Sequence, residues 1–394
     1  MILGMGTNKR DYVEMSNRLG IHTGGIRTWQ FSCVPVGRRD EIVSYLFFKG
    51  RALMDKLDDL FDIFAELFAE FNFDNHKRLV ELIRSVKSDM EDSLIPHGNQ
   101  YVGTRITSYC SRIGRFNEVT EGITFFKFVE ALLERAEKDP AGVAEDLREV
   151  AQILFNRNNL LMSVVTEASD YPRFEKNIAR LMGVFSETPQ VPAEWSWDPP
   201  PQNEAFLTSS KVQHVGKGAN LYDLGYEYSG KFNVLKSLIS THYLWDRVRL
   251  MGGAYGSSNS FDYLSGDYCF ISYRDPNLKE TLSVYDEVAE YIENLDLAKE
   301  ELTKLIIGCV GHLDPPLTAD RKGSVAMVEY LSGKTFEMKQ KFRDELLSTR
   351  LEDLKAMAPL FKKIREQGKV CVLGNEDKIQ KSRKDFDHLV RIVT

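Results

Sequence analysis

The sequence predicts a mixed α+β protein of two similar domains, in each of which helices pack on a sheet. Segments with a period of two and segments with a period of 3.6 are interspersed along both halves of the chain. They do not follow the strict strand-helix alternation of a doubly wound sheet. The 394 residues also exceed one ordinary domain.

One proline-rich segment divides the chain into halves of similar length. Residues 186–203 read SETPQVPAEWSWDPPPQN and hold five of the 13 prolines. Proline fixes φ and removes a hydrogen-bond donor, so this stretch continues neither a helix nor a central strand. It predicts a semi-rigid linker between a first domain at 1–185 and a second at 204–394. Trp195 and Trp197 indicate that the linker lies against a surface.

The first half mixes strands with a larger number of helices. Residues from Arg27 to Cys33 alternate between two faces, which indicates a strand. Apolar residues between 57 and 71, many of them Phe, recur at helical spacing and are expected in the core. Asp74 or Asn75 should cap the helix that follows. The other elements expected here are a helix at 10–19, a strand at 42–47, helical segments at 99–155, a strand at 160–166 and a helix at 172–184.

The second half has the same mixture. Residues 268–273 are apolar on both faces, as is typical of a buried strand. Asp275 should cap a helix that carries Pro276 in its first turn. A helix at 231–250 should stop at the glycines that follow it. The other elements expected here are an extended segment at 205–217, helices at 297–308, 318–331, 335–347 and 351–367, and a strand at 369–373.

Composition excludes several classes of protein. There are 51 Lys and Arg against 58 Asp and Glu, a net charge of −7, which argues against a nucleic-acid or anionic-membrane partner. No apolar run reaches the about 18 residues of a membrane span. The five scattered cysteines include no C-x-x-C pair, which favours a reducing compartment. The start, MILGMGTNKRDYVEM, has no secretory pattern and resembles the end of an apolar helix.

No complete catalytic motif is present. Helical H-E-x-x-H and its inverse H-x-x-E-H place two His residues four apart, and no two of the seven His residues have that spacing. The sequence therefore predicts no metal site on this chain. A phosphate-binding loop and a G-x-S-x-G elbow are also missing, and Gly216-Lys217-Gly218 is too short to indicate nucleotide binding.

Residues 243–277 stand out because a helix with two arginines ends at paired glycines. Arg249 precedes Gly252 and Gly253, and Tyr255 and Gly256 follow them. Both Arg and Tyr donate hydrogen bonds and can act on a carbonyl or an oxyanion. The pattern alone favours a different interpretation, an ordinary helix C-cap with a terminal Arg and a packed Tyr.

Several runs resemble one peptidase family. HVGKGANLYDLGYEYSG at 214–230, LWDRVRLMGGAYG at 244–256 and FISYRDPNLKETLSVYD at 270–286 are similar to pitrilysin-type (inverzincin) zinc metallopeptidases of the presequence protease and falcilysin branch. MGTNKRDYVEMSNRLGIHTGGI at 5–26 resembles the third domain of those enzymes, and GHLDPPLTADRKG at 311–323 resembles part of the fourth. The resemblance covers essentially the whole chain, as the C-terminal half of the family.

The resemblance implies two related domains with mostly antiparallel sheets. It also implies that strands before the third domain's first helix are missing here, so the chain is expected to be a fragment. In the family, two halves face each other across a closed chamber, and the N-terminal half carries H-x-x-E-H and the zinc. This chain alone is therefore expected to bind no zinc and to be inactive. Its expected partners are the N-terminal catalytic half, on the same or a separate chain, and unfolded peptide substrates.

The resemblance also gives roles to the residues at the helix end. Tyr255 would donate to the scissile carbonyl as it becomes an oxyanion, and Arg249 would orient the substrate main chain. Gly252, Gly253 and Gly256 would shape the substrate-binding loop. Close branch members have glycine where this sequence has Ser257, which leaves the detailed shape of the loop open.

A second function fits the same resemblance. The chain could be a non-catalytic, structural or peptide-binding subunit that pairs with an active partner. The resemblance implies a cytoplasmic location in a bacterium, and the mitochondrial matrix or a plastid in a eukaryote.

Overall fold

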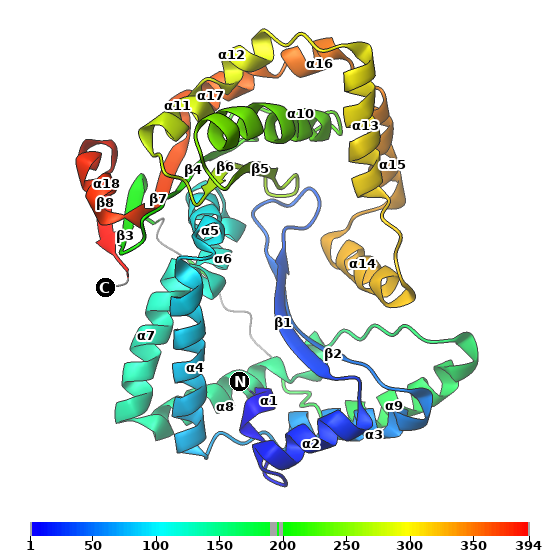
Figure 1. The fold of residues 1–394 in the computed structure, drawn as a ribbon. Helices are drawn as coiled ribbons and strands as arrows, with labels where there is room; N and C mark the ends of the chain where they lie inside the picture. Colours follow the sequence, from blue (N-terminus) through cyan, green and yellow to red (C-terminus); the bar gives the residue numbers. More distant parts are fainter. Residues whose placement is uncertain (1, 190–194, 197–199, 393–394) are drawn as a thin grey trace.

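The computed structural model describes residues 2–189, 195–196 and 200–392. It confirms the mixed α+β class. A two-stranded sheet and many helices belong to the first half of the sequence, and a six-stranded sheet belongs to the second (Figure 1). Within these residues, no helix has both the length and the apolar character needed to cross a membrane.

The six-stranded sheet has the order β5-β6-β4-β7-β3-β8. Its strand β3 runs parallel to β7 and β8, and the other three pairs are antiparallel. The first sheet is an antiparallel pair of β1 and β2. The strands are β1 (Ile26–Cys33), β2 (Val43–Gly50), β3 (Glu204–Thr208), β4 (His214–Asn220), β5 (Gly256–Phe261), β6 (Asp267–Tyr273), β7 (Lys369–Asn375) and β8 (His388–Arg391).

Helices of the first half connect the two sheets. Helices α4 and α7 run side by side between the six-stranded sheet and the helices near the N-terminus (Figure 1). Asn75 caps α4, as expected, by accepting a hydrogen bond from the Arg78 main-chain N–H at 3.1 Å. The helices are α1 (Ile2–Met5), α2 (Tyr12–His22), α3 (Leu57–Ala69), α4 (His76–Leu94), α5 (Gly98–Cys110), α6 (Arg112–Glu121), α7 (Ile123–Lys138), α8 (Pro140–Leu154) and α9 (Tyr171–Met182), with short 3₁₀ turns η1 (Met54–Lys56), η2 (Arg157–Asn159) and η3 (Ala168–Asp170).

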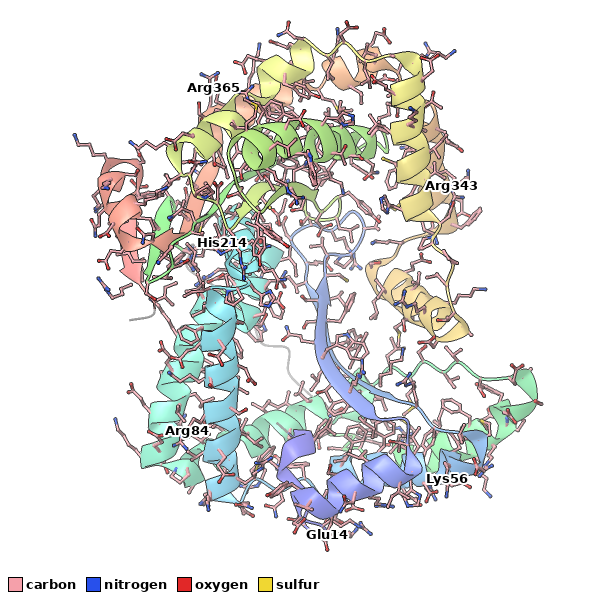
Figure 2. The ribbon with its side chains drawn as sticks, viewed as in Figure 1. Glu14, Lys56, Arg84, His214, Arg343 and Arg365 are labelled. Carbon is pink, nitrogen blue, oxygen red and sulfur yellow. The ribbon has the colours of Figure 1, made fainter. Side chains whose placement is uncertain are left out.

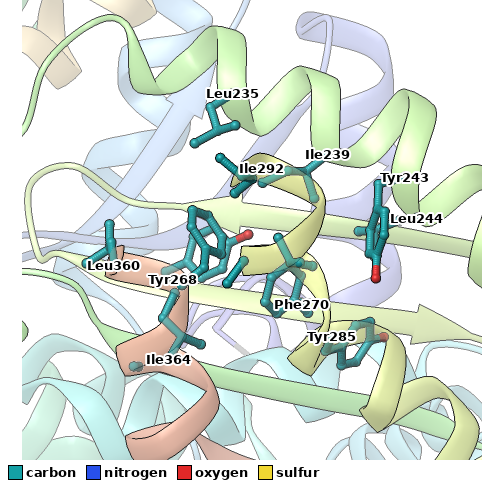
Figure 3. Packing of buried hydrophobic residues seen from close by; sticks show 14 of the residues in the cluster. Leu235, Ile239, Tyr243, Leu244, Tyr268, Phe270, Tyr285, Ile292, Leu360 and Ile364 are labelled. Carbon is teal, nitrogen blue, oxygen red and sulfur yellow. The ribbon is translucent and has the colours of Figure 1, made fainter. Parts of the chain in front are cut away.

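Helices of the second half cover one face of the six-stranded sheet. Tyr268 and Phe270 of β6 pack there against Tyr285, Leu360 and Ile364 in the largest core cluster (Figure 3). The helical elements are α10 (Phe232–Leu238), the π-helix η4 (Ile239–Met251), α11 (Lys279–Asp286), α12 (Val288–Glu293), α13 (Lys299–Leu313), α14 (Ala319–Ser332), α15 (Phe336–Leu347), α16 (Leu351–Lys355), α17 (Ala358–Gln367), α18 (Glu376–Lys381) and the 3₁₀ turn η5 (Arg383–Asp385).

The opposite face of this sheet is covered by α5, a helix of the first half. Val102 and Ile106 of α5 pack against Phe206 and other strand residues. Two glycines of β4 make this approach possible. A Cβ at Gly216 would lie 2.4 Å from Ile106 Cδ1, and one at Gly218 would lie 2.5 Å from Ile106 Cγ2. The Gly-Lys-Gly run is thus explained by close packing of a helix on a strand.

A buried ion-pair network joins the same two parts of the chain. Arg105 of α5 donates to Glu204 of β3 at 2.7 Å and to Glu118 of α6 at 2.9 Å. Burial favours the neutral form of Arg105, but the two carboxylates outweigh it and raise the pKa of the guanidinium. Tyr109 also donates to Glu204, at 2.8 Å. These contacts fix α5 against the sheet in one register.

Three local expectations are wrong. Residues 160–166 form no strand; Leu160 and Met162 instead pack against the apolar cluster of α3 and α9. Asp275 does not cap a helix, since α11 begins only at Lys279. Residues 256–261, expected as a loop, form β5 because they pair with β6.

The division at 186–203 stays a prediction. Trp195 lies against the first half, as its ring is 6.4 Å from that of Phe116 and its carbonyl accepts a hydrogen bond from Arg112 at 3.0 Å. Trp197 lies outside the described residues.

Candidate functional site

The end of the π-helix and the start of β5 border an open depression of about 470 Å³. It includes three of the five residues that the sequence predicted, and the other two, Gly252 and Gly256, flank them. A π-helix is rare and often occurs at functional sites. The depression is lined by Arg249, Leu250, Gly253, Ala254, Tyr255 and Arg274.

The paired glycines close the helix by a tight turn. Gly253 has a φ of 78°, in the left-handed region that favours glycine. This turn lets the Ala254 N–H reach the Val248 carbonyl at 3.1 Å. A Cβ at Gly252 would lie only 2.6 Å from the same carbonyl oxygen. Asn277 Nδ2 donates to the Gly252 carbonyl at 2.6 Å and holds the turn in place.

Arg249 is held by an aromatic ring, and no carboxylate of the described residues pairs with it. Its guanidinium carbon lies 4.0 Å from the ring centre of Trp245 and 6.0 Å from that of Tyr255. Its neighbour Arg247, by contrast, pairs with Glu287 at 2.7 Å. Stacking orients the guanidinium plane and leaves its N–H groups available to a ligand.

Tyr255 points its polar end away from the protein. Its side chain is 66% exposed, and its ring meets Tyr273 edge-on at 5.6 Å. Its hydroxyl has no hydrogen-bond partner in the described part of the chain. Its main-chain N–H donates to the carbonyl of Arg274 at 3.3 Å. The position of the residue is thus fixed while its hydroxyl stays free to bind.

Arg274 is a site residue that the sequence did not predict. It has a φ of 48°, unusual for a residue other than glycine. The backbone there is held because Asp275 and Gln213 exchange two main-chain hydrogen bonds of 2.8 Å. The guanidinium carbon of Arg274 lies 5.3 Å from the ring centre of Tyr273. Only the aromatic residue before it could have served as a sequence signal.

Asp275 supports the depression from inside the protein. Its carboxylate is buried and accepts hydrogen bonds from the Thr281 hydroxyl at 2.7 Å and the Asn277 N–H at 2.8 Å. Burial raises its pKa. Through Asn277 this carboxylate is linked to the turn at Gly252.

The structure gives no cluster of metal ligands. Among the described residues, no three or more His, Cys, Asp or Glu side chains come together where they could hold a metal ion. His214 is fully buried where β4 meets α5 (Figure 2). Its Nε2 lies 3.0 Å from the Ile95 carbonyl oxygen, and burial lowers its pKa to about 4. It is therefore neutral at physiological pH.

Two family models match the chain. Residues 203–376 match the model described as the PreP C-terminal domain. Residues 1–132 match the model of a domain associated with the peptidases of family M16, subfamily C. Together they cover most of the sequence.

Known proteins give the same assignment. Protein HypA of Clostridium perfringens is 31% identical over 100% of this chain and 40% of its own length. Presequence protease 1, chloroplastic/mitochondrial, of Arabidopsis thaliana is 31% identical over 99% of this chain and 36% of its own length. The chain thus spans about two-fifths of these relatives.

A solved structure agrees with the fold. The peptidase M16 inactive domain from Pseudomonas fluorescens matches with a TM-score of 0.61 at 13% identity, over 95% of this chain and 86% of that one. The family models, the relatives and the fold together show that this chain belongs to the pitrilysin-type peptidases, in the presequence protease branch, and corresponds to their C-terminal half.

Proposed function

We propose that this chain is the non-zinc-binding half of a chambered zinc metalloendopeptidase that degrades unstructured peptides. Its contributions are a chamber wall, substrate positioning and transition-state hydrogen bonds. One observation carries the proposal: Arg249 and Tyr255 lie on the same open depression with donors that no described residue uses. Such donors suit a reacting group that is supplied from outside this chain.

The partner half would hold the zinc, which polarises the scissile carbonyl and activates water when bound. In this chain, the Tyr255 hydroxyl donates to the carbonyl oxygen as negative charge develops on it. Arg249, kept in place by Trp245, binds a neighbouring main-chain carbonyl of the peptide. The turn at Gly252 and Gly253 fixes the separation between these two donors.

Exposed apolar side chains beside the depression suit an extended peptide. Leu250 is 65% exposed and Met251 is 76% exposed, and Trp245 is also open to solvent. Apolar groups gathered on a surface mark a place where a ligand or another protein binds. The depression is open rather than enclosed, so an unfolded chain can lie across it. A folded substrate would present its side chains less freely.

The alternative, a non-catalytic subunit that pairs with an active partner, is less well supported. A purely structural wall would have no need of an Arg and a Tyr with unused donors at one helix end. The compartment follows from the source of the chain. The Arabidopsis relative is named as chloroplastic and mitochondrial.

The test is a complementation assay with a quenched, unstructured peptide. The purified chain is assayed alone, with zinc, and after mixing with a separately produced N-terminal half. We expect cleavage only on mixing, and a loss of cleavage in Tyr255→Phe and Arg249→Ala. Tyr330→Phe, at a tyrosine that is 73% exposed on α14, and Arg247→Ala, on the same helix as Arg249, are the matched controls. Cleavage by the chain alone, abolished by a chelator, would overturn the proposal.

A further inference from the structure

We propose that the depression at the end of the π-helix also binds a carboxylate of the peptide, and that Arg274 is the residue that selects it. This inference rests on the proposed function, because it names a feature of the substrate bound beside Tyr255. The carboxylate is either that of an Asp or Glu side chain or the C-terminal group of the peptide. Both present the same planar anion to a guanidinium.

Two unneutralised guanidinium groups line one depression. Neither Arg249 nor Arg274 has a carboxylate of the described residues within ion-pair distance. Nearby arginines of the same half differ in this respect, since Arg247 pairs with Glu287 and Arg365 pairs with Glu290. Like charges that share a hollow repel each other, and an anion placed between them removes that repulsion.

The carboxylate nearest in sequence does not serve this purpose. Asp275 follows Arg274 directly, but its two oxygens accept hydrogen bonds from the Thr281 hydroxyl and the Asn277 N–H. The Asp275 carboxylate is buried, whereas Arg274 is exposed. The positive charge of Arg274 therefore remains available at the surface of the depression.

The backbone at Arg274 points to a use for its side chain. A φ of 48° is a conformation that glycine adopts freely and that a side chain makes unfavourable. The bridge between Gln213 and Asp275 imposes this conformation, together with the hydrogen bond from the Tyr255 N–H. An arginine in such a place lies over the ring of Tyr273, which orients its planar fork.

The geometry also places the anion relative to the reacting carbonyl. Since the Tyr255 N–H bonds the Arg274 carbonyl, the two side chains start from adjoining backbone on the same rim. A carboxylate bound by Arg274 would therefore lie close along the peptide to the carbonyl that Tyr255 contacts. Peptides with an acidic group near the cleaved bond should be preferred over neutral ones.

The test uses two series of matched peptides and the enzyme assembled from both halves. In one series Glu replaces Gln at successive positions around a single cleavage site, and in the other the C-terminus is a free acid or an amide. We expect kcat/KM to be at least about tenfold higher for the acidic member in one series, as for one charged hydrogen bond. The series that shows the preference identifies the source of the carboxylate. The preference should shrink as salt is added.

Variants of Arg274 decide whether this residue causes the preference. Arg274→Gln and Arg274→Asn should bring the ratio of the two kcat/KM values to about one, and Arg274→Lys should keep part of it. Asn tolerates the left-handed backbone, so it separates loss of charge from strain. Arg321→Gln is the control, an exposed arginine of α14 away from the depression. A ratio unchanged in Arg274→Gln, or equal losses for both peptides, would overturn the inference.

A second readout separates this inference from the proposed function. The same peptides, labelled with a fluorophore, are titrated with this chain alone, and binding is followed by polarisation. Cleavage on mixing without any preference for acidic peptides contradicts only the role of Arg274. No cleavage on mixing, with tighter binding of acidic peptides that is lost in Arg274→Gln, contradicts only the proposed function.

Discussion

The main-chain nitrogen of Tyr255 donates a hydrogen bond to the carbonyl oxygen of Arg274 across 3.3 Å. This bond continues the pairing of β5 with β6 and joins the residue before β5 to the residue after β6. A side chain predicted from the sequence is thereby placed beside one that was not. The two share a depression because the hairpin aligns them.

Replacing Tyr255 by Phe should lower kcat of the assembled enzyme by roughly 100- to 1000-fold, as for the loss of one oxyanion donor. KM should change little, since the hydroxyl acts mainly on the charge of the transition state. The melting temperature of the chain should not change, because the hydroxyl has no partner in the described part of the protein. A raised KM at unchanged kcat would show that Tyr255 only holds the substrate.

Trp245 should matter through Arg249. In Trp245→Leu the guanidinium loses a cation–π contact worth about 0.5–1 kcal/mol at an exposed site, so kcat/KM should fall about two- to fivefold. Trp245→Phe should keep part of the activity because a ring remains. Steady-state kinetics measure both variants. Equal values for Leu and Phe would show that the ring does not position Arg249.

Gly216→Ala should destabilise the chain by about 1–3 kcal/mol, the usual range for overpacking. The new Cβ would lie 2.4 Å from Ile106 Cδ1 and 2.6 Å from Val102 Cγ1. Gly308→Ala is the control, because nothing lies within 4 Å of its Cβ in α13 and alanine favours a helix. Urea unfolding should show a loss for the first variant and a small gain for the second. No loss in Gly216→Ala would mean that α5 moves away from the sheet easily.

Two buried groups should oppose each other in acid. His214 has its pKa lowered to about 4 by burial, from about 6.5 when unfolded, so its contribution to stability is lost as the pH falls from about 6.5 to 4. Asp267 has its pKa raised to about 6 by burial, from about 3.8. The folded chain takes up that proton first, so the contribution of Asp267 increases stability as the pH falls from about 6 to 3.8.

Single variants should therefore reveal each slope. Asp267→Asn should make the free energy of unfolding fall more steeply between pH 6.5 and 4.5, because only the effect of His214 remains. His214→Gln should reduce or reverse that slope. Urea titrations at several pH values measure both. The same slope in both variants as in the unchanged chain would show that neither group titrates in this range.

The fold class, the helix end and the locations of Arg249 and Tyr255 could be predicted because local patterns determine them. The strand β5 could not, since its sequence GSSNSF has little strand propensity. Its stability comes from partners far away, such as the bond from Asn259 Nδ2 to the Lys236 carbonyl at 3.0 Å. Arg274 was missed for a related reason, because the bridge of Asp275 with Gln213 imposes its left-handed backbone.

The expected strand at 160–166 failed for the opposite reason. Its alternating pattern suited a strand, but no described strand lies beside it, and its apolar residues find contacts on helices instead. Alternation of side chains is evidence for a strand only where a partner strand exists.

The coverage of the six-stranded sheet by α5 has a consequence for synthesis of the chain. Arg105 leaves the ribosome 99 residues before its partner Glu204, and β7 and β8 follow only near the C-terminal end. Until then Val102 and Ile106 have no sheet to cover, and the helix that carries them exposes an apolar face. Contacts so distant in sequence slow folding and leave a nascent chain open to aggregation. Productive folding of this polypeptide is therefore a late, largely post-translational event that favours the protection of a chaperone.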